Sequence, residues 1–319
     1  MLRFMLSALL ALAAALPAAA QTWPSRPVRL VLSQPPGSSP DILARLIADR
    51  LAKRWGQGVV VENRPGGQNV VGALAVLQAP ADGYTFYHAT AAALVINAYT
   101  FKALPYDPKK DFVPVGMIGQ SGFVIAANPS TGFNSIADLV AYAKANPDKL
   151  SVATEGPKTF SGMMASMFAA TAGLKLVAVP YSGVQPGILD TVAGRTQLTV
   201  QAAAATMTHL QRGALRPLAV TTAKRIPGLE MVPTLAETFP GFEYSGWQAV
   251  VASQATPPDA IRRFSADLAA VLRDPDVVKR LLDLGVVAEP GTAEQLGEYL
   301  AAEHARWAKL AKDVGVVPE

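Results

Sequence analysis

The chain of 319 residues contains no cysteine and only three histidines, and these shortages exclude several kinds of chemistry. Without cysteine there is no disulfide, no thiolate nucleophile, no cysteine-based metal site and no lipoprotein attachment residue. The histidines, at positions 88, 209 and 304, lie too far apart to show the spacing of metal ligands. We therefore expect neither a bound metal nor thiol chemistry.

Catalytic motifs are also missing. The sequence has no G-x-S-x-G, no Walker loop and no G-x-G-x-x-G. The segment Gly119-Gln-Ser-Gly122 approaches a nucleophile elbow, but Phe123 stands where the last glycine belongs. We expect no enzymatic activity and no cofactor.

Charge is scarce and evenly spread. Charged residues make up 16% of the chain, and 28 Lys and Arg against 24 Asp and Glu leave a formal charge of +4. Nucleic-acid binding needs a concentrated basic surface, so we do not expect a nucleic-acid partner. Half of the residues are hydrophobic, which predicts a well-buried globular chain, and the length fits about two domains.

Residues 1–20 have the pattern of a secretory signal peptide. Arg3 is followed by an apolar stretch and then by the small residues Ala18 to Ala20. The apolar stretch is shorter than the ~20 residues of a membrane-spanning helix, and no basic flank follows it. We expect cleavage near Ala20 and export of a soluble chain.

Strand-like and helix-like segments alternate along the chain. In the first half we expect strands at 28–32, 59–61, 84–88, 115–118 and 123–127, and helices at 41–55 and 69–77. In the second cycle we expect strands at 150–153, 177–181, 198–201 and 215–221, and helices at 135–144 and 161–172. Such alternation predicts parallel sheets with helices on both faces.

The last part of the chain returns to the first sheet. A strand at 248–252 is followed by three helices, at 260–272, 275–284 and 293–313, that we expect to wrap a sheet formed earlier. A chain that leaves the first lobe near residue 125 and returns near 248 crosses twice, which is a hinge geometry. The sequence thus predicts an α/β fold of two lobes with a cleft between them. Lobe 1 would hold residues 21–125 and 248–319, and lobe 2 residues 126–247.

The loop at Pro35-Pro-Gly37 interrupts an apolar run that resumes as a helix, with Ser39 as the expected N-cap and Pro40 as the first helical residue. Free N–H groups and the helix dipole at such a start favour an anion. Ligands of open α/β sheets bind beyond the carboxyl ends of the strands, where this loop must lie. An ordinary capped loop explains the same residues, so both interpretations stay open at this point.

Gly156–Ser161 repeats this pattern in the second lobe. Lys158 within it is either a solvated surface lysine or, if the loop faces the cleft, a charge for a carboxylate. A third helix opens after Tyr181, whose ring either packs in the core or contacts a ligand. Two helix N-termini at about 0.3–1 kcal/mol each do not hold a ligand. Three or four charge-assisted hydrogen bonds at about 1.5–3 kcal/mol each suffice for micromolar affinity.

A series of short motifs runs through nearly the whole chain after residue 20. They are Trp23-Pro-Ser-Arg-Pro27, Pro35-Pro-Gly37 with Asp41-Ile-Leu-Ala-Arg45, Val61-Glu-Asn-Arg-Pro-Gly66, Asp82-Gly-Tyr84, Leu104-Pro-Tyr-Asp107, Val179-Pro-Tyr181, Leu218-Ala-Val-Thr221 and Val232-Pro-Thr234. Each motif is weak singly, but in this order the set is specific. The chain resembles the Bug-type (tctC-like) periplasmic solute-binding receptors of tripartite tricarboxylate transporters.

The resemblance implies a periplasmic-binding-protein (Venus flytrap) fold, in which two lobes joined by two crossing strands close on a small carboxylate. It further implies a monomeric periplasmic receptor that delivers this ligand to membrane transporter subunits. A receptor that serves a signalling partner and an exported enzyme using the same cleft are the alternatives. The implied ligand set is Pro36, Gly37, Ser38, Ser39 and Asp41 from the first loop, and Gly156, Lys158, Thr159, Ser161 and Tyr181 from the second lobe.

Departures from the family pattern bear on the ligand. Gln34 replaces the usual aromatic residue before Pro-Pro-Gly, and Gly162 stands where a histidine is common. Gln201 replaces a common acidic residue, and losing that carboxylate disfavours an amino-acid ligand. Lys158 and Phe160 instead favour a ligand with more negative charge or an aromatic ring, such as a di- or tricarboxylate or an aromatic carboxylate.

Overall fold

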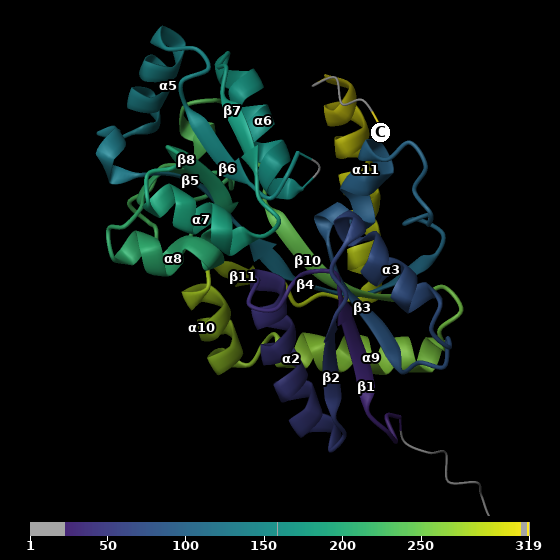
Figure 1. Ribbon diagram of the computed structural model, residues 1–319. Helices are drawn as coiled ribbons and strands as arrows, with labels where there is room; N and C mark the ends of the chain where they lie inside the picture. The colour runs from purple at the N-terminus through teal and green to yellow at the C-terminus, as the bar shows by residue number, and fades with distance from the viewer. Residues whose placement is uncertain (1–22, 158, 314–317, 319) are drawn as a thin grey trace, which may run out of the picture.

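A computed structural model describes residues 23–157, 159–313 and 318, and within them two sheets carry helices on their faces (Figure 1). The strands of the first sheet are β1 (Val28–Leu32), β2 (Val59–Asn63), β3 (Thr85–Thr90), β4 (Phe112–Ser121), β10 (Gly246–Ser253) and β11 (Val286–Ala288). Those of the second are β5 (Phe123–Ala127), β6 (Ser151–Thr154), β7 (Val177–Pro180), β8 (Leu198–Ala202) and β9 (Arg216–Val220). Their spatial orders are β11-β4-β10-β3-β1-β2 and β7-β6-β8-β5-β9.

Helices connect most of these strands. They are α2 (Ser39–Trp55), α3 (Val70–Leu77), α4 (Asn97–Thr100), α5 (Ile136–Ala145), α6 (Phe160–Ala172), α7 (Val184–Val192), α8 (Ala203–Gln211), α9 (Pro258–Val271), α10 (Pro275–Asp283) and α11 (Ala293–Asp313). The predicted helices are all present, whereas α4, α8 and β11 were not expected from the sequence. No helix among the described residues is both long enough and apolar enough to cross a membrane.

The prediction of parallel sheets is wrong for part of each sheet. β1 pairs in parallel with β2 and β3, but β10 is antiparallel to both β3 and β4, and β11 is antiparallel to β4. In the second sheet, β6 is parallel to β7 and β8, whereas β5 is antiparallel to β8 and β9. Parallel pairing follows from a helix crossover within one sheet. Strands that come from the other sheet, as β5 and β10 do, have no such constraint.

The chain passes between the sheets at two neighbouring points. β4 ends at Ser121 and β5 begins at Phe123, so the outward change falls at Gly122 rather than near residue 125. The return falls at Gly246, which pairs with Ser121, so the two crossings lie side by side. The hydroxyl of Ser245 also donates to Gln120 Oε1 at 2.5 Å across them. The assignment of residues to two separate lobes remains a prediction.

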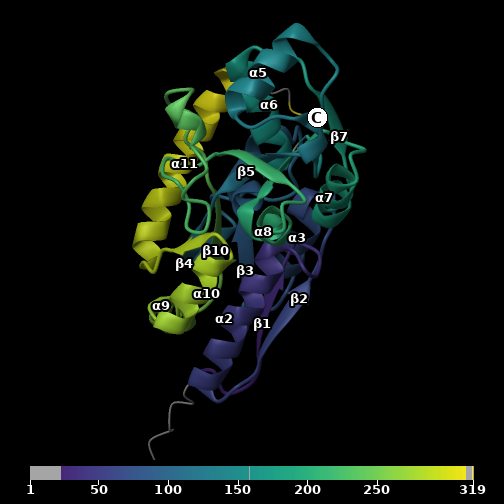
Figure 2. The same ribbon diagram turned by 90° about the vertical axis from the view of Figure 1, so that its left-hand side faces the viewer.

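Helix α11 follows one side of the molecule from the first sheet to the helices of the second (Figure 2). Trp307 on α11 packs against Phe160 of α6, with ring centroids 6.4 Å apart. Glu303 on the same helix accepts a hydrogen bond from Trp247 Nε1 at 3.0 Å. The last helix therefore contacts elements of both sheets near the crossings.

The carboxylate of Asp267 ties α9 to α2. It is buried and accepts hydrogen bonds from Trp55 Nε1 at 2.7 Å, Arg54 Nε at 2.5 Å and Arg263 Nε at 2.6 Å. Burial raises the pKa of this carboxyl, but the three donors outweigh the burial and hold the pKa below its ordinary value. The sequence does not reveal this tie, because Trp55 and Asp267 lie 212 positions apart.

We expect Asp267→Ala to lower the free energy of unfolding by about 2–4 kcal/mol, because it leaves a half-buried indole N–H unpaired and two guanidinium groups without their anion. Urea denaturation at neutral pH measures the change. Asp283→Ala is the matched control, since it removes only the exposed partner of Lys279 and should cost below about 1 kcal/mol. Equal losses in the two variants would contradict the role of Asp267.

Candidate ligand-binding site

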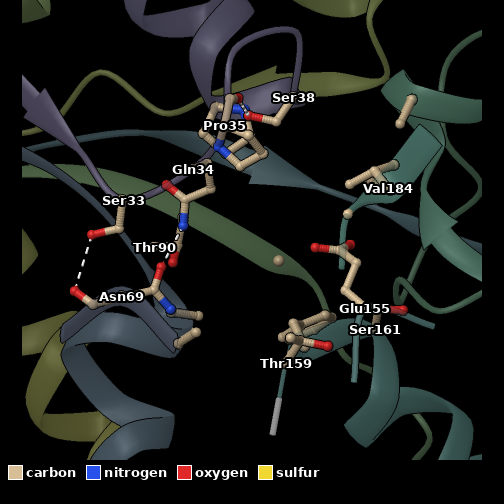
Figure 3. Close-up of a pocket in the computed structure, with 18 of the residues that line it drawn as sticks. Ser33, Gln34, Pro35, Ser38, Asn69, Thr90, Glu155, Thr159, Ser161 and Val184 are labelled. Atoms are coloured by element: carbon tan, nitrogen blue, oxygen red, sulfur yellow. Dashed lines mark hydrogen bonds between the residues drawn. The ribbon is translucent and has the colours of Figure 1, made fainter. Parts of the chain in front are cut away.

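A cavity of about 300 Å³ lies between the two sheets and is lined by residues from both (Figure 3). Gln34 and Thr90 contribute from the side of the first sheet, and Glu155 and Val184 from the side of the second. Most lining segments directly follow a parallel strand, which is where open α/β sheets bind their ligands. The volume lies at the low end of the range for small-molecule sites and suits a small metabolite.

Five helices begin at the wall of this cavity. Their N-cap residues all line it: Ser38 for α2, Asn69 for α3, Thr159 for α6, Gly183 for α7 and Ala202 for α8. The first N–H groups of a helix have no partner within the helix, and the dipole adds about 0.3–1 kcal/mol of attraction for an anion. The sequence pointed to three of these starts, those of α2, α6 and α7. At α3 and α8 some of these N–H groups already bond to loop carbonyls, Val71 to Gly66 and Ala203 to Gly122, so the free donors lie mainly at α2, α6 and α7. These helix starts make the cavity attractive to an anion without a basic side chain among its described lining residues.

Asp41 holds the loop that precedes α2. Its carboxylate is 3% exposed and accepts the N–H of Gly37 at 2.9 Å, Asn63 Nδ2 at 2.9 Å and Arg45 Nε at 3.1 Å. Burial raises the pKa of Asp41, but these donors, Arg45 first, outweigh the burial and lower the pKa. Both the carboxylate and the Gly37 N–H are therefore engaged inside the protein, and neither residue lines the cavity.

The helix after this loop starts one residue earlier than expected. α2 begins at Ser39, so the N-cap is Ser38 rather than Ser39. The Ser38 hydroxyl donates to the carbonyl of Pro35 at 2.7 Å instead of accepting an N–H of the helix. No side chain therefore caps the first N–H groups of α2.

Three residues of the implied ligand set line the cavity: Ser38, Thr159 and Ser161. The other described members lie outside its lining: Pro36, Gly37, Asp41, Gly156 and Tyr181. Lys158 and the side chain of Ser39 lie outside the described part of the chain. The hydroxyl of Tyr181 donates to Asp190 Oδ2 at 2.8 Å, which engages it within the second lobe.

The hydroxyls at the start of α6 already have partners. Thr159 Oγ1 accepts the N–H of Gly162 at 3.1 Å and donates to the carbonyl of Gly156 at 2.8 Å. Ser161 Oγ donates to the carbonyl of Val200 at 2.6 Å. The backbone N–H groups of Phe160 and Ser161 have no acceptor among the described residues. This wall can therefore offer backbone donors to a ligand.

The sequence analysis missed the polar groups on the opposite wall. Gln34 Nε2 donates to Asn69 Oδ1 at 2.5 Å, and Gln34 Oε1 is buried without a partner in the described structure. Thr90 Oγ1 is also buried and unpaired among the described residues. The departure of Gln34 from the family pattern was the one signal available for this wall, because Asn69 and Thr90 reach the site only through the fold.

Glu155 was also missed, although it follows β6 directly. Its carboxyl projects into the cavity (Figure 3), and no described residue donates a hydrogen bond to it. Burial raises the pKa of this carboxyl to about 7. The described lining residues include no Lys, Arg or His, so Glu155 is the one ionisable side chain among them.

Two residues singled out in the sequence have structural surroundings. Phe160 lines the cavity but also packs against Phe123, with ring centroids 4.6 Å apart. Gln201, which replaces the common acidic residue, is fully buried, and both of its amide atoms lack partners among the described residues. It does not line the cavity.

Two α/β sheets joined by paired crossings, with an anion-attracting cavity between them, define a two-lobed solute-binding receptor. Residues 43–316 match the sequence family described as "Tripartite tricarboxylate transporter family receptor", and the chain belongs to this family.

Relatives agree with this assignment over most of their length. The "UPF0065 protein in tcbD-tcbE intergenic region" of Pseudomonas sp. (strain P51) is 35% identical over 90% of this chain and 86% of its own. The "Protein BugT" of Bordetella pertussis is 31% identical over 94% of this chain and 93% of its own. The solved structure "R. palustris Rpa4515 with adipate" superposes with a TM-score of 0.89 at 36% identity, over 93% of this chain and 100% of that one.

Proposed function

We propose that this protein is an extracytoplasmic receptor that captures a small carboxylate in the cavity and delivers it to the membrane subunits of a tripartite tricarboxylate transporter. The convergence of five helix N-caps on one cavity carries this proposal. A relative solved with adipate supports the ligand class. The signal-like residues 1–20, with cleavage near Ala20, fit a periplasmic location but lie outside the described residues.

The affinity would come from backbone donors rather than from a lysine or arginine of the described lining. Three or four N–H groups bonded to a carboxylate at about 1.5–3 kcal/mol each offset the cost of association and leave micromolar binding. Asp41 and Gly37 act in this proposal by fixing the loop at α2. Thr159 does the same for the loop at α6.

The paired crossings at Gly122 and Gly246 are the proposed hinge, about which lobes of residues 123–245 and the remainder of the mature chain close. The two walls of the cavity belong to different sheets, so ligand binding and lobe closure would be coupled. The receptor is proposed to act as a monomer.

Thermal unfolding of the mature protein with a panel of organic acids and neutral sugars tests the proposal. A carboxylate at about 100 times its dissociation constant should add about 2.7 kcal/mol to the stability of the folded state, and neutral sugars should add nothing. Stabilisation by sugars alone would contradict the anion site. Nuclear magnetic resonance of the bound acid after prolonged incubation should show it unchanged, and turnover would contradict a role in binding alone.

A further inference from the structure

The carboxyl of Glu155 projects into the cavity, and no described residue donates a hydrogen bond to it (Figure 3). The side chain is partly exposed, so a ligand in the cavity can reach it. Gln34 lines the opposite wall, and its Oε1 is buried without a partner among the described residues. A ligand that brings a donor would supply the partner that Glu155 lacks.

We propose that the ligand carries a protonated nitrogen as well as a carboxylate, and that Glu155 accepts a hydrogen bond from this nitrogen. This inference rests on the proposed function and names its ligand class: a small amino-carboxylate with no net charge. The carboxylate would lie at the helix N-termini, and the ammonium group would lie at Glu155.

The charge balance of the site favours this class over a dicarboxylate. A second ligand carboxylate would bring another negative charge beside Glu155, in a cavity whose described lining holds no cation. Like charges a few Å apart at low dielectric disfavour each other by several kcal/mol. In the sequence, Gln201 stands in place of a common acidic residue, and this replacement disfavours an amino-acid ligand. The structure supplies an acid from the loop after β6 instead.

The protonation state of Glu155 gives a specific readout. Its pKa of about 7 means that the ionised form predominates only above neutral pH. An ammonium group binds the ionised form, so affinity should rise about tenfold from pH 6 to pH 8. His88, behind the lining residue Gln248, is buried with its pKa lowered to about 4 and stays neutral over this range. Lys158 is in the same loop as Glu155 but lies outside the described residues. The variant Lys158→Ala tests whether this lysine contributes to the pH dependence.

Calorimetric titration with matched acids tests the inference. Each set shares a carbon skeleton: hexanoate, adipate and 6-aminohexanoate; butanoate, succinate and 4-aminobutanoate; and the 2-amino acids of the same lengths. The wild type should bind at least one amino-carboxylate more tightly than its mono- and dicarboxylate counterparts. Glu155→Gln should weaken that binding by at least about tenfold and remove its pH dependence. Glu298→Gln, an exposed change outside the cavity lining, should leave both unchanged.

The outcomes separate this inference from the proposed function. Binding of mono- or dicarboxylates in preference to every amino counterpart would overturn the role of Glu155 and leave the receptor function standing. Equal binding by wild type and Glu155→Gln would do the same, as would loss of the pH dependence in Lys158→Ala with Glu155 intact. Absence of binding by all the acids would overturn the proposed function, and this inference with it. Thermal unfolding without ligand checks that each variant is folded.

Discussion

Gly162→Ala is expected to weaken ligand binding by at least about 100-fold, which corresponds to about 2.7 kcal/mol. A Cβ at this position would lie 2.0 Å from the carbonyl oxygen of Gly156, 2.7 Å from its carbonyl carbon and 2.9 Å from Pro157 Cα. All three are backbone atoms, so the loop before α6 must move as a whole. That loop carries Glu155 and the Thr159 cap, and its displacement would remove most of one wall of the cavity.

Titration with whichever acid binds the wild type measures this loss, and urea denaturation should show a loss of stability of about 1–3 kcal/mol. Gly297→Ala on α11 is the control, because its nearest neighbour would be Pro114 Cγ at 3.7 Å and alanine favours a helix interior. That control should bind normally and be equally or slightly more stable. Unchanged binding by Gly162→Ala would mean that the loop does not form the site. Any side chain with a Cβ at this position would meet the same backbone atoms.

Asp41→Ala is expected to remove detectable binding and to lower the free energy of unfolding by about 2–4 kcal/mol. The change leaves the Gly37 N–H without its acceptor and removes one of the two acceptors of Asn63 Nδ2, so the loop at the start of α2 loses contacts that shape it. Because the pKa of Asp41 is lowered in the folded state, its contribution is present above the unfolded value near 4 and is lost as pH falls through the folded value.

Urea denaturation measures the stability of the variants Asp41→Ala, Asp41→Asn and Asp49→Ala, and ligand titration measures their binding. Asp49 forms an exposed pair with Lys53 on the same helix, so its loss should change the stability little and leave binding intact. The asparagine variant keeps one acceptor oxygen, so its stability and its affinity should lie between those of the other two variants. A wild-type affinity in Asp41→Ala would show that the loop conformation does not depend on this carboxylate.

Local patterns in the sequence predicted the elements well. The first strand is confirmed residue for residue, and the apolar spacing of Leu43, Ile47 and Leu51 correctly identified the buried face of α2. The direction of β10 could not be predicted in the same way, because it depends on the sheet from which the chain returns. Helix α8 was missed because its residues, rich in alanine and threonine, follow β8 with no separating loop.

The binding site was predictable only in part. A serine or threonine before a helix marked the starts of α2 and α6, and the loops at these starts do line the cavity. The sequence could not show that the N-caps at Asn69 and Ala202 reach the same space, because that requires the folding of both sheets. Asp41 and Tyr181 were chosen by resemblance, but their polar atoms are engaged by neighbours within the protein. Glu155 carries no local signal at all, since its role depends on the absence of a partner.

The positions of Gln34 and Glu155 have a consequence for how such receptors diversify. Each residue lies within two positions of the end of a strand, β1 or β6, whose own apolar side chains are buried in the sheet. A substitution at either position changes the groups that a ligand meets but leaves the packing of the strand in place. Receptors built on this fold can therefore come to recognise different ligands through a few changes at strand ends, while the packing of their sheets stays the same.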